Sequence, residues 1–300
     1  MFKPYGLIFL HKNKPSAYIT TMKILSNVPL KNKTTFRCGG TAKWFAEPDN
    51  FIEFETLLKL HKGRLFILGG GSKTICVDTG FDGLVISTKN LSKIYMEKGA
   101  VVAEAGATFE KLRAFCTQNA LSGLEWSAGI PASVGGAVVM NAGAFGHDFS
   151  ESVLKVEIFE NGKRKLLEKS DITFSYRNSS LKGKTVLRVW LGLEKSSSKE
   201  VQESYLKHLA EKEKNQPVCA GSAGSIFKRS ENVILAKIID KLGLKGVKIG
   251  GAEVSTHHSG FIINTGTATA SEVLSLVEFI RQKVLEKTGV VLENELIVLE

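Results

Sequence analysis

Three glycine-rich segments give this sequence its clearest chemical signal. They are Phe36-Arg37-Cys38-Gly39-Gly40-Thr41, Leu68-Gly69-Gly70-Gly71-Ser72 and Gly129-Ile130-Pro131-Ala132-Ser133-Val134-Gly135-Gly136. Consecutive amides without intervening side chains form a concave nest that suits phosphate oxygens. A single loop of this kind is more often a tight turn, but three of them in one chain suggest a large ligand that carries a pyrophosphate.

Two common phosphate-binding motifs are absent. The run Gly70-Gly71-Ser72-Lys73-Thr74 is similar to a P-loop, but that motif requires glycine at the positions of Ile67 and Ser72. A Gly-x-Gly-x-x-Gly fingerprint fails as well, because Thr74 stands where its third glycine would be. The sequence therefore disfavours both a P-loop nucleotide site and an ordinary Rossmann dinucleotide site.

The cysteines and histidines do not have the spacing of a metal site. The cysteines are scattered along the chain, at Cys38, Cys76, Cys116 and Cys219. Without zinc spacing they are expected to be reduced thiols. The adjacent His257 and His258 would point to opposite sides of a strand, so a structural or rim role is favoured over metal binding.

Composition and charge narrow the function classes further. The 40 lysines and arginines exceed the 30 acidic residues, which gives a formal net charge of +10. The basic residues are spread out, and runs such as 207–214 suit a solvated helix face, so a polyanionic metabolite is favoured over nucleic acid. No apolar run approaches the roughly 20 residues that span a bilayer, so membrane insertion is not expected. The apolar stretch near the N-terminus is too short for a signal peptide, and a cytoplasmic protein is predicted.

The rest of the sequence predicts the strands and helices that must position these loops. Strands are predicted at 43–47, 64–68, 83–87, 100–105, 153–160, 185–193, 260–264 and 290–299. Helices are predicted at 50–62, directly after Thr108, and at 197–214, 232–241 and 270–288. Asn161-Gly162 is a hairpin signal, whereas the tract around Gly135 carries no strong helix signal. Pro217 marks the predicted main domain boundary.

Further segments follow the glycine loops in a recognisable order. They are Met140-Asn141-Ala142-Gly143-Ala144, Ser175-Tyr176-Arg177-Asn178-Ser179, Ser222-Ala223-Gly224-Ser225-Ile226-Phe227-Lys228, Gly250-Gly251-Ala252-Glu253-Val254-Ser255, Phe261-Ile262-Ile263-Asn264 and Leu292-Glu293-Asn294-Glu295. Together with the glycine loops, this order resembles the UDP-N-acetylenolpyruvoylglucosamine reductase (MurB) family from about residue 27 to the C-terminus. The short segment between Arg177 and Pro217 is similar to that of the type II branch.

The resemblance implies an α+β fold. Two FAD-binding subdomains of the vanillyl-alcohol oxidase (PCMH) type would be followed by a C-terminal α+β substrate-binding domain. Residues 1–21 are then an N-terminal extension, expected to be loose, 22–87 and 88–214 are the FAD-binding subdomains, and 215–300 is the substrate-binding domain. A monomer is expected.

The resemblance also implies the reaction. Hydride would pass from NADPH through non-covalently bound FAD to the enolpyruvyl methylene of a UDP-sugar. The product, UDP-N-acetylmuramate, serves peptidoglycan synthesis, and with it cell-wall biogenesis, cell shape and cell division. The partners would be these small molecules, without nucleic acid or metal. The residues implied in FAD binding are Arg37, Gly39, Gly40, Gly69, Gly70, Gly71, Ser72, Gly129, Ile130, Pro131, Ser133, Val134, Gly135, Gly136, Asn141 and Gly143.

The same resemblance implies three catalytic residues. Hydride addition leaves negative charge beside the substrate carboxylate, and Arg177 would hold that carboxylate bidentately as the charge develops. Ser225 would protonate the resulting enolate, with Glu295 assisting because a serine hydroxyl is a weak acid by itself. Each residue alone is more often structural, and only their joint order favours catalysis. The implied substrate contacts are Tyr176, Lys228 and Glu253.

Some positions depart from the family pattern, and other functions stay open. Lys73 replaces a usual asparagine and would add a charge near the pyrophosphate. Another flavin oxidoreductase of this fold, acting on a sugar or hydroxy acid, would carry a His or Cys bonded to FAD, for which Cys38 is the one candidate. A phosphate-metabolite protein without redox chemistry and a basic nucleic-acid-binding protein are the further alternatives. The other departures are Ala132, Phe145 and Arg229.

Overall fold

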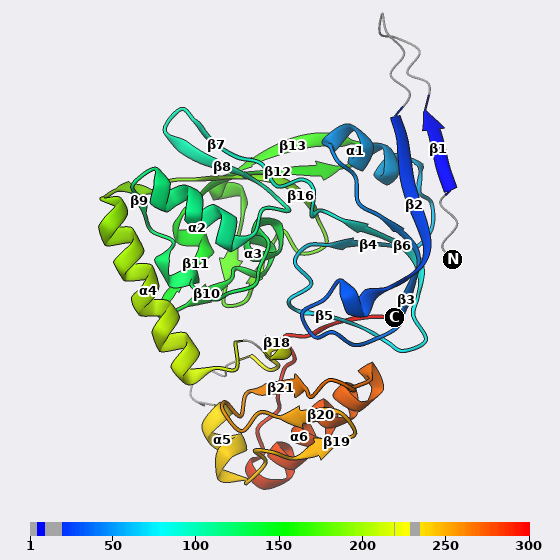
Figure 1. Cartoon of the computed structure of the whole chain (residues 1–300), viewed down its shortest axis with the longest axis vertical. Helices are drawn as coiled ribbons and strands as arrows, with labels where there is room; N and C mark the ends of the chain where they lie inside the picture. Colours follow the sequence, from blue (N-terminus) through cyan, green and yellow to red (C-terminus); the bar gives the residue numbers. More distant parts are fainter. Residues whose placement is uncertain (1–4, 10–19, 219, 229–234) are drawn as a thin grey trace, which may run out of the picture.

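The computed structural model describes residues 5–9, 20–218, 220–228 and 235–300, with side chains from Met22 onward. Three larger β-sheets, accompanied by two-stranded pairs, follow one another along this part of the chain (Figure 1). Helices pack beside each sheet, and the C-terminal segment returns from the third sheet toward the first (Figure 1). The candidate site lies where this segment crosses.

The first sheet contains a parallel β-α-β unit. Its strands, in spatial order, are β1 (Tyr5–Phe9), β2 (Thr20–Pro29), β3 (Thr41–Ala46), β6 (Phe81–Ser87) and β4 (Leu65–Leu68). The helix α1 (Phe51–Leu60) connects β3 to β4, as the sequence predicted. The Asn50 side chain caps α1 by accepting from Glu53 N. Phe54 and Leu57 of α1 are buried in the core of this sheet.

Residues 5–9 form a strand, which corrects the expectation that all of 1–21 is a loose extension. β1 pairs antiparallel with β2, with Tyr5 opposite Ile24 and Phe9 opposite Thr20. An edge strand offers unpaired backbone groups to a neighbouring extended segment, and β1 satisfies them along β2. Residues 1–4 and 10–19 lie outside the described part of the chain.

The second sheet is built from the middle of the chain. Its strands, in spatial order, are β13 (Lys163–Glu168), β12 (Val153–Glu160), β16 (Thr185–Leu191), β8 (Ala100–Glu104) and β7 (Ile94–Glu97). The predicted hairpin at Asn161-Gly162 joins β12 to β13, and both of its residues have positive φ. The helix α2 (Phe109–Gln118) begins after Thr108, as predicted, because the Thr108 side chain accepts from Lys111 N. The helix α4 (Ser198–Asn215) follows within one residue of its predicted bounds.

The helix α3 (Val134–Met140) lies in the glycine-rich tract, where the sequence predicted no helix. Ser133 caps it by accepting from Gly136 N (3.3 Å). Val134, Ala137 and Val138 are buried in the core of the second sheet. Burial of this apolar face outweighs the poor helix propensity of two glycines. Tertiary packing therefore makes this helix.

The third sheet belongs to the C-terminal part of the chain. Its strands, in spatial order, are β18 (Gly221–Ser225), β21 (Phe261–Asn264), β20 (Ala252–Val254) and β19 (Lys248–Ile249). The helix α6 (Ala270–Thr288) has its predicted bounds, begins at the Thr269 cap and ends at Gly289, whose φ is +71°. The helix α5 (Leu235–Lys241) confirms most of the helix predicted at 232–241, whose first residues lie outside the described part.

The predicted final strand at 290–299 is wrong for most of its length. Only β22 (Ile297–Leu299) is paired in a sheet ladder, and it runs parallel to β5 (Thr74–Cys76). Before β22, Asn294 forms an isolated bridge with Phe227. Residues 290–296 connect two parts of the fold, so they cannot line one sheet continuously. We call 290–300 the C-terminal tail.

Two further observations concern the hydrophobicity of the helices and the state of the cysteines. None of the described helices is both long and apolar enough to cross a bilayer. Cys38, Cys76 and Cys116 are buried free thiols, and Cys219 lies outside the described residues. Burial raises the pKa of Cys38 to about 12, helped by the negative charge of Asp78. Its thiol is therefore protonated and unreactive at neutral pH.

Candidate active site

A buried carboxylate, Glu295, lies between two basic side chains from remote parts of the chain. Its Oε2 is 2.7 Å from Lys73 Nζ, and its Oε1 is 3.8 Å from Arg177 Nε. The Glu295 side chain is 3% exposed, so the paired charges must compensate for its lost hydration. Lys73 follows the second glycine loop and Glu295 belongs to the C-terminal tail, so the fold alone brings this cluster together.

Backbone hydrogen bonds fix the position of Glu295. Its amide donates to Ile226 O (2.8 Å), in the turn that follows β18. Two residues later, Ile297 N donates to Lys73 O (2.7 Å) as the tail enters β22. The carboxylate is thus held between the turn after Ser225 and the end of the second glycine loop.

Ser225 is half-buried at the end of β18. Gly224 precedes it with φ +70°, a conformation that favours glycine. The Ser225 hydroxyl donates to Phe227 O (3.2 Å), and the Ser225 carbonyl accepts from Lys73 Nζ (2.6 Å). Ser225 and Glu295 therefore share one neighbour, the Lys73 ammonium.

Arg177 occupies a two-residue hairpin turn between β14 (Phe174–Ser175) and β15 (Asn178–Ser179). Its φ of +53° is uncommon for a residue with a side chain and costs on the order of 1 kcal/mol. Nη2 donates to Gly143 O (2.6 Å), and the guanidinium carbon lies 4.9 Å from the centroid of the Tyr176 ring. Strain at a charged residue that faces a buried carboxylate is typical of a functional site.

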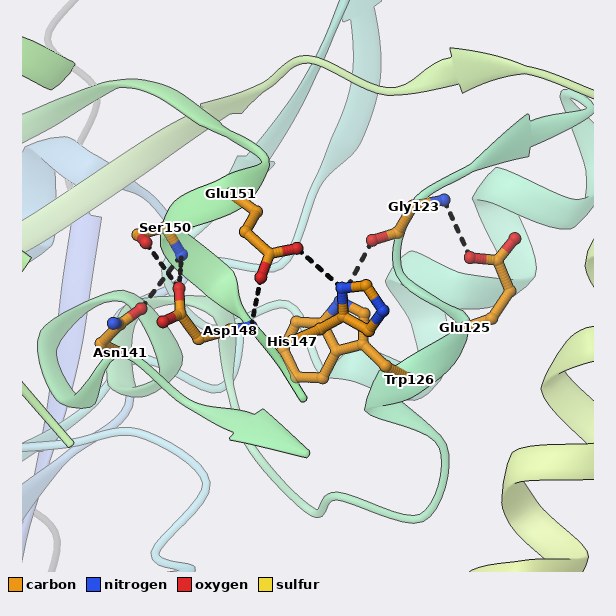
Figure 2. Close-up of polar contacts among 8 residues, drawn as sticks. All are labelled: Gly123, Glu125, Trp126, Asn141, His147, Asp148, Ser150 and Glu151. Atoms are coloured by element: carbon orange, nitrogen blue, oxygen red, sulfur yellow. Dashed lines mark hydrogen bonds and ion pairs between the residues drawn. The ribbon is translucent and has the colours of Figure 1, made fainter. Parts of the chain in front are cut away.

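Asn141, an expected FAD contact, uses its side-chain amide inside the protein. Oδ1 accepts from Ser150 N (3.0 Å), which also donates to Asp148, as Figure 2 shows. Nδ2 donates to Ser175 O (3.2 Å). The amide therefore ties the end of α3 to the hairpin that carries Arg177, and any cofactor contact would come from the backbone of Asn141.

The second and third glycine loops touch each other. Gly70 N donates to Ser133 Oγ (3.2 Å), and a Cβ on Gly69 would lie 2.3 Å from the same oxygen. None of the hydrogen bonds among the described residues uses the amide of Gly71 or Ser72. Two successive amides without a protein acceptor form the kind of nest that suits a phosphate oxygen. The other expected FAD contacts in the third loop are Gly129, Ile130 and Pro131 before α3, and Val134, Gly135 and Gly136 in its first turn.

Close packing inside the protein explains why the first loop contains glycines. A Cβ on Gly39 would lie 2.1 Å from Cys76 O, and one on Gly40 would lie 2.6 Å from Val77 O. The carbonyl of Arg37 accepts from Asn264 Nδ2 (3.2 Å), which ties this loop to the third sheet. Packing therefore requires these glycines whether or not they contact a ligand. Gly143 is similar, because a Cβ there would lie 2.3 Å from His147 O.

Two expected substrate contacts form ion pairs of their own. Lys228 Nζ pairs with Glu293, and Glu253 Oε2 lies 3.2 Å from Lys248 Nζ. Tyr176 is exposed beside Arg177. The structure thus brings together the three expected catalytic residues and leaves Lys228 and Glu253 paired elsewhere.

No group of three or more metal-binding side chains occurs among the described residues.

Lys73 has protein contacts that the sequence did not predict. An extra charge beside a pyrophosphate was expected, but the ammonium contacts Glu295 and the Ser225 carbonyl. The contact depends on the path of the C-terminal tail, which no local pattern reveals. Lys73 is therefore part of the cluster around Glu295, and a charge near the pyrophosphate stays a prediction.

Lys212, on α4, is a buried lysine that the sequence reasoning missed. Its Nζ donates to Ala128 O (3.1 Å), next to the third glycine loop. Burial, together with the positive charge of Arg177, lowers the pKa of Lys212 to about 8. The sequence suggested a solvated face, yet Lys212 lies about three helical turns after the buried Val201 and so on the same side. That periodicity is the signal that identifies it.

Comparisons with known proteins assign the chain to a family. A model of the C-terminal domain of UDP-N-acetylenolpyruvoylglucosamine reductase matches residues 216–299, and an FAD-binding domain model matches residues 45–164. The chain is 40% identical to the UDP-N-acetylenolpyruvoylglucosamine reductase of Caldanaerobacter subterraneus subsp. tengcongensis over 280 aligned residues. These residues cover 91% of this chain and 93% of the relative. The chain belongs to this reductase family.

Other members of the reductase family agree along nearly the whole chain. The Thermotoga maritima reductase is 37% identical over 266 residues, which cover 87% of this chain and 94% of that protein. The crystal structure of MurB from Thermus caldophilus matches with a TM-score of 0.82 at 32% identity, covering 93% of this chain and 100% of that one. The family resemblance and the α+β fold expected from the sequence motifs are confirmed.

Proposed function

We propose that this protein is an FAD-dependent reductase that converts UDP-N-acetylenolpyruvoylglucosamine to UDP-N-acetylmuramate, with NADPH as the reductant. The observation that carries the proposal is the cluster of Arg177, Ser225 and Glu295, which a chain of the reductase family assembles from remote segments. Reduction of an enolpyruvyl ether needs an anion-binding group and a proton donor at one place. The cluster contains both.

The glycine loops fit FAD held without a covalent bond. The second and third loops lie against each other, with the amides of Gly71 and Ser72 lacking a protein acceptor. A Cβ on Gly69 would lie 2.3 Å from Ser133 Oγ and one on Gly70 would lie 3.0 Å from Pro131 O, so glycine allows the second loop to approach the third this closely. The protonated, buried thiol of Cys38 does not suit a covalent flavin bond.

Acid precipitation is expected to release all of the yellow colour into the supernatant. A non-covalent cofactor is lost when the fold that holds it is destroyed, whereas a covalent flavin stays with the polypeptide. The flavin absorbance of pellet and supernatant gives the measurement. Colour retained in the pellet would argue for an oxidase of the same fold instead.

Arg177 is proposed to bind the carboxylate of the substrate. Bound FAD would supply the hydride that adds to the enolpyruvyl double bond, and negative charge would then develop beside that carboxylate. The bond from Nη2 to Gly143 O fixes the plane of the guanidinium and leaves other N–H groups for a bidentate contact. Lys212 is proposed to add positive charge on this side, most fully below about pH 8, where its ammonium persists.

Ser225 is proposed to give its hydroxyl proton to the carbon that carries the developing charge. In the free protein that hydroxyl bonds to Phe227 O, and rotation about its Cβ–Oγ bond frees the proton for a substrate. Serine is a weak acid, so the neighbouring charges must stabilise the oxygen after the proton leaves. The Lys73 ammonium and the Glu295 carboxylate are proposed to provide this network.

The remaining assignments follow from this function. We assign 22–87 and 88–214 to FAD binding and 215–300 to substrate binding, on the ground that each region builds its own sheet. Tyr176, Lys228 and Glu253 are proposed to contact the UDP-sugar, the last two after exchanging their present ion pairs. A cytoplasmic monomer that supplies peptidoglycan precursors, and so supports cell shape and division, is proposed.

A steady-state assay tests the function. Purified protein, supplied with the enolpyruvyl UDP-sugar, is expected to consume NADPH and to form UDP-N-acetylmuramate in equal amounts. The product is quantified by mass spectrometry, and NADPH consumption without a reduced sugar would contradict the proposal.

A further inference from the structure

The Lys73 ammonium links the flavin-side loop to both groups proposed to handle the proton. Nζ lies 2.7 Å from Glu295 Oε2 and donates to Ser225 O at 2.6 Å. The main chain of Lys73 also accepts from Ile297 N, in the same tail as Glu295. One residue therefore holds the C-terminal tail by its backbone and the proposed proton-handling groups by its side chain.

The charges around Lys73 support a fixed ammonium. Its side chain is 24% exposed and that of Glu295 is 3% exposed. Burial lowers the pKa of Lys73, the Glu295 carboxylate opposes this shift, and Arg177 adds to it. A Cβ on Gly224 would lie 3.5 Å from Nζ, so the backbone before Ser225 packs directly against the ammonium. The Lys73 ammonium therefore compensates directly for the lost hydration of the Glu295 carboxylate.

The two oxygens of Glu295 face different cations. Oε2 pairs with Lys73, while Oε1 lies 3.8 Å from Arg177, a distance too long for a hydrogen bond. Without the Lys73 charge, the carboxylate would be drawn toward Arg177 by the remaining unscreened attraction. It would then compete with a substrate carboxylate for the same guanidinium.

We propose that Lys73 is a positioning residue for the protonation step. It fixes Glu295 and the Ser225 turn relative to each other and keeps Arg177 available for the substrate. The inference rests on the proposed function, because it requires these three residues to act on the enolpyruvyl sugar. Lys73 itself does not contact the reacting atoms and acts through its two neighbours.

Lys73→Met tests the inference, because methionine keeps similar length but removes the charge and the donor. Anaerobic stopped-flow absorbance separates flavin reduction by NADPH from reoxidation by the sugar. Reduction is expected at the wild-type rate, whereas reoxidation slows roughly 10- to 100-fold, since small displacements of reacting groups have effects of this size. Lys73→Arg, which retains a cation, is expected to recover most of the rate.

A cycle with Glu295→Gln shows whether Lys73 acts through that carboxylate. In the Glu295→Gln background, Lys73→Met is expected to cost less than it does in the wild type. Thermal unfolding and flavin content of all variants report on folding. Lys184→Met is the matched control, because Lys184 also forms an ion pair, with Glu160 at 2.5 Å, and neither partner belongs to this cluster. Its half-reactions and flavin content are expected to match the wild type.

Several outcomes would overturn the inference. Equal slowing of both half-reactions would make Lys73 a general structural contact, and flavin loss without slower reoxidation would make it a cofactor contact. Equal costs of Lys73→Met in both backgrounds would exclude action through Glu295. Wild-type flavin that the sugar does not reoxidise would contradict the proposed function as well. Normal wild-type reoxidation with an unaffected Lys73→Met variant would reject the role of Lys73 alone.

Discussion

Ser225→Ala is expected to leave flavin reduction by NADPH at the wild-type rate and to slow reoxidation by the enolpyruvyl sugar about 10²- to 10⁴-fold. The proton that Ser225 is proposed to give is needed only after hydride has reached the sugar. The turn itself should survive, because the Ser225 carbonyl, which Lys73 contacts, is unchanged. Anaerobic stopped-flow absorbance of the flavin measures each half-reaction separately.

Two further variants separate proton donation from a role in folding the turn. Ser225→Cys is expected to retain more reoxidation than alanine, since a thiol of similar size can still donate a proton. Ser222→Ala removes a hydroxyl from the same strand, one that accepts from Gly224 N at 3.5 Å, and controls for the loss of a strand hydroxyl beside the turn. Near-normal reoxidation of Ser225→Ala would reject the proton-donor role, and slower reduction by NADPH would indicate that the turn supports the flavin site.

Arg177→Lys is expected to slow reoxidation about 10²-fold, comparable to the loss of one oxyanion-hole donor. Lysine keeps the positive charge but loses the planar fork that binds a carboxylate bidentately. It also loses the geometry of the Nη2 bond to Gly143 O, which fixes the guanidinium plane. The affinity for the sugar should fall together with the rate, while reduction by NADPH is unchanged.

The control for this variant is Arg164→Lys, at an arginine that pairs with Glu55 at 2.6 Å outside the cluster. It is expected to change neither half-reaction. Circular dichroism and flavin content check that Arg177→Lys is folded, since the positive φ at this position imposes a similar strain on either side chain. Equal loss of both half-reactions in Arg177→Lys would assign the arginine to folding or to the flavin site.

Local signals in the sequence predicted most of the helices and strands. Asn50, Thr108 and Thr269 cap helices as their residue types favour, and Gly289 ends α6 in the left-handed conformation. These features depend on neighbours within a few residues. These helix ends can therefore be predicted from the local sequence, without knowledge of the rest of the fold.

The features that were wrong or missed depend on distant contacts. α3 forms because its apolar face is buried in the second core, despite Gly135 and Gly136. The tail after α6 leaves the third sheet to pair with β5, so its apolar residues do not continue as one strand. Propensity scales that consider only nearby residues cannot represent either contact.

The candidate site also combines residues that sequence motifs identified with residues whose contacts come from distant parts of the chain. Order along the chain was enough to select Arg177, Ser225 and Glu295, and the structure brings them together. Lys73 was expected to add charge near a pyrophosphate because it directly follows the second glycine loop, and its contact with a carboxylate more than 200 residues away was not foreseen. Lys212 was not singled out from the other lysines of α4. It differs from them in lying on the same buried helix face as Val201.

The central claim is that reduced flavin in this protein is reoxidised by the enolpyruvyl UDP-sugar. The most direct measurement is a single anaerobic turnover in which enzyme reduced by stoichiometric NADPH is mixed with UDP-N-acetylenolpyruvoylglucosamine. The account predicts return of the oxidised-flavin absorbance and formation of one UDP-N-acetylmuramate per flavin. Flavin that stays reduced with the sugar, yet is reoxidised when oxygen is admitted, would contradict it.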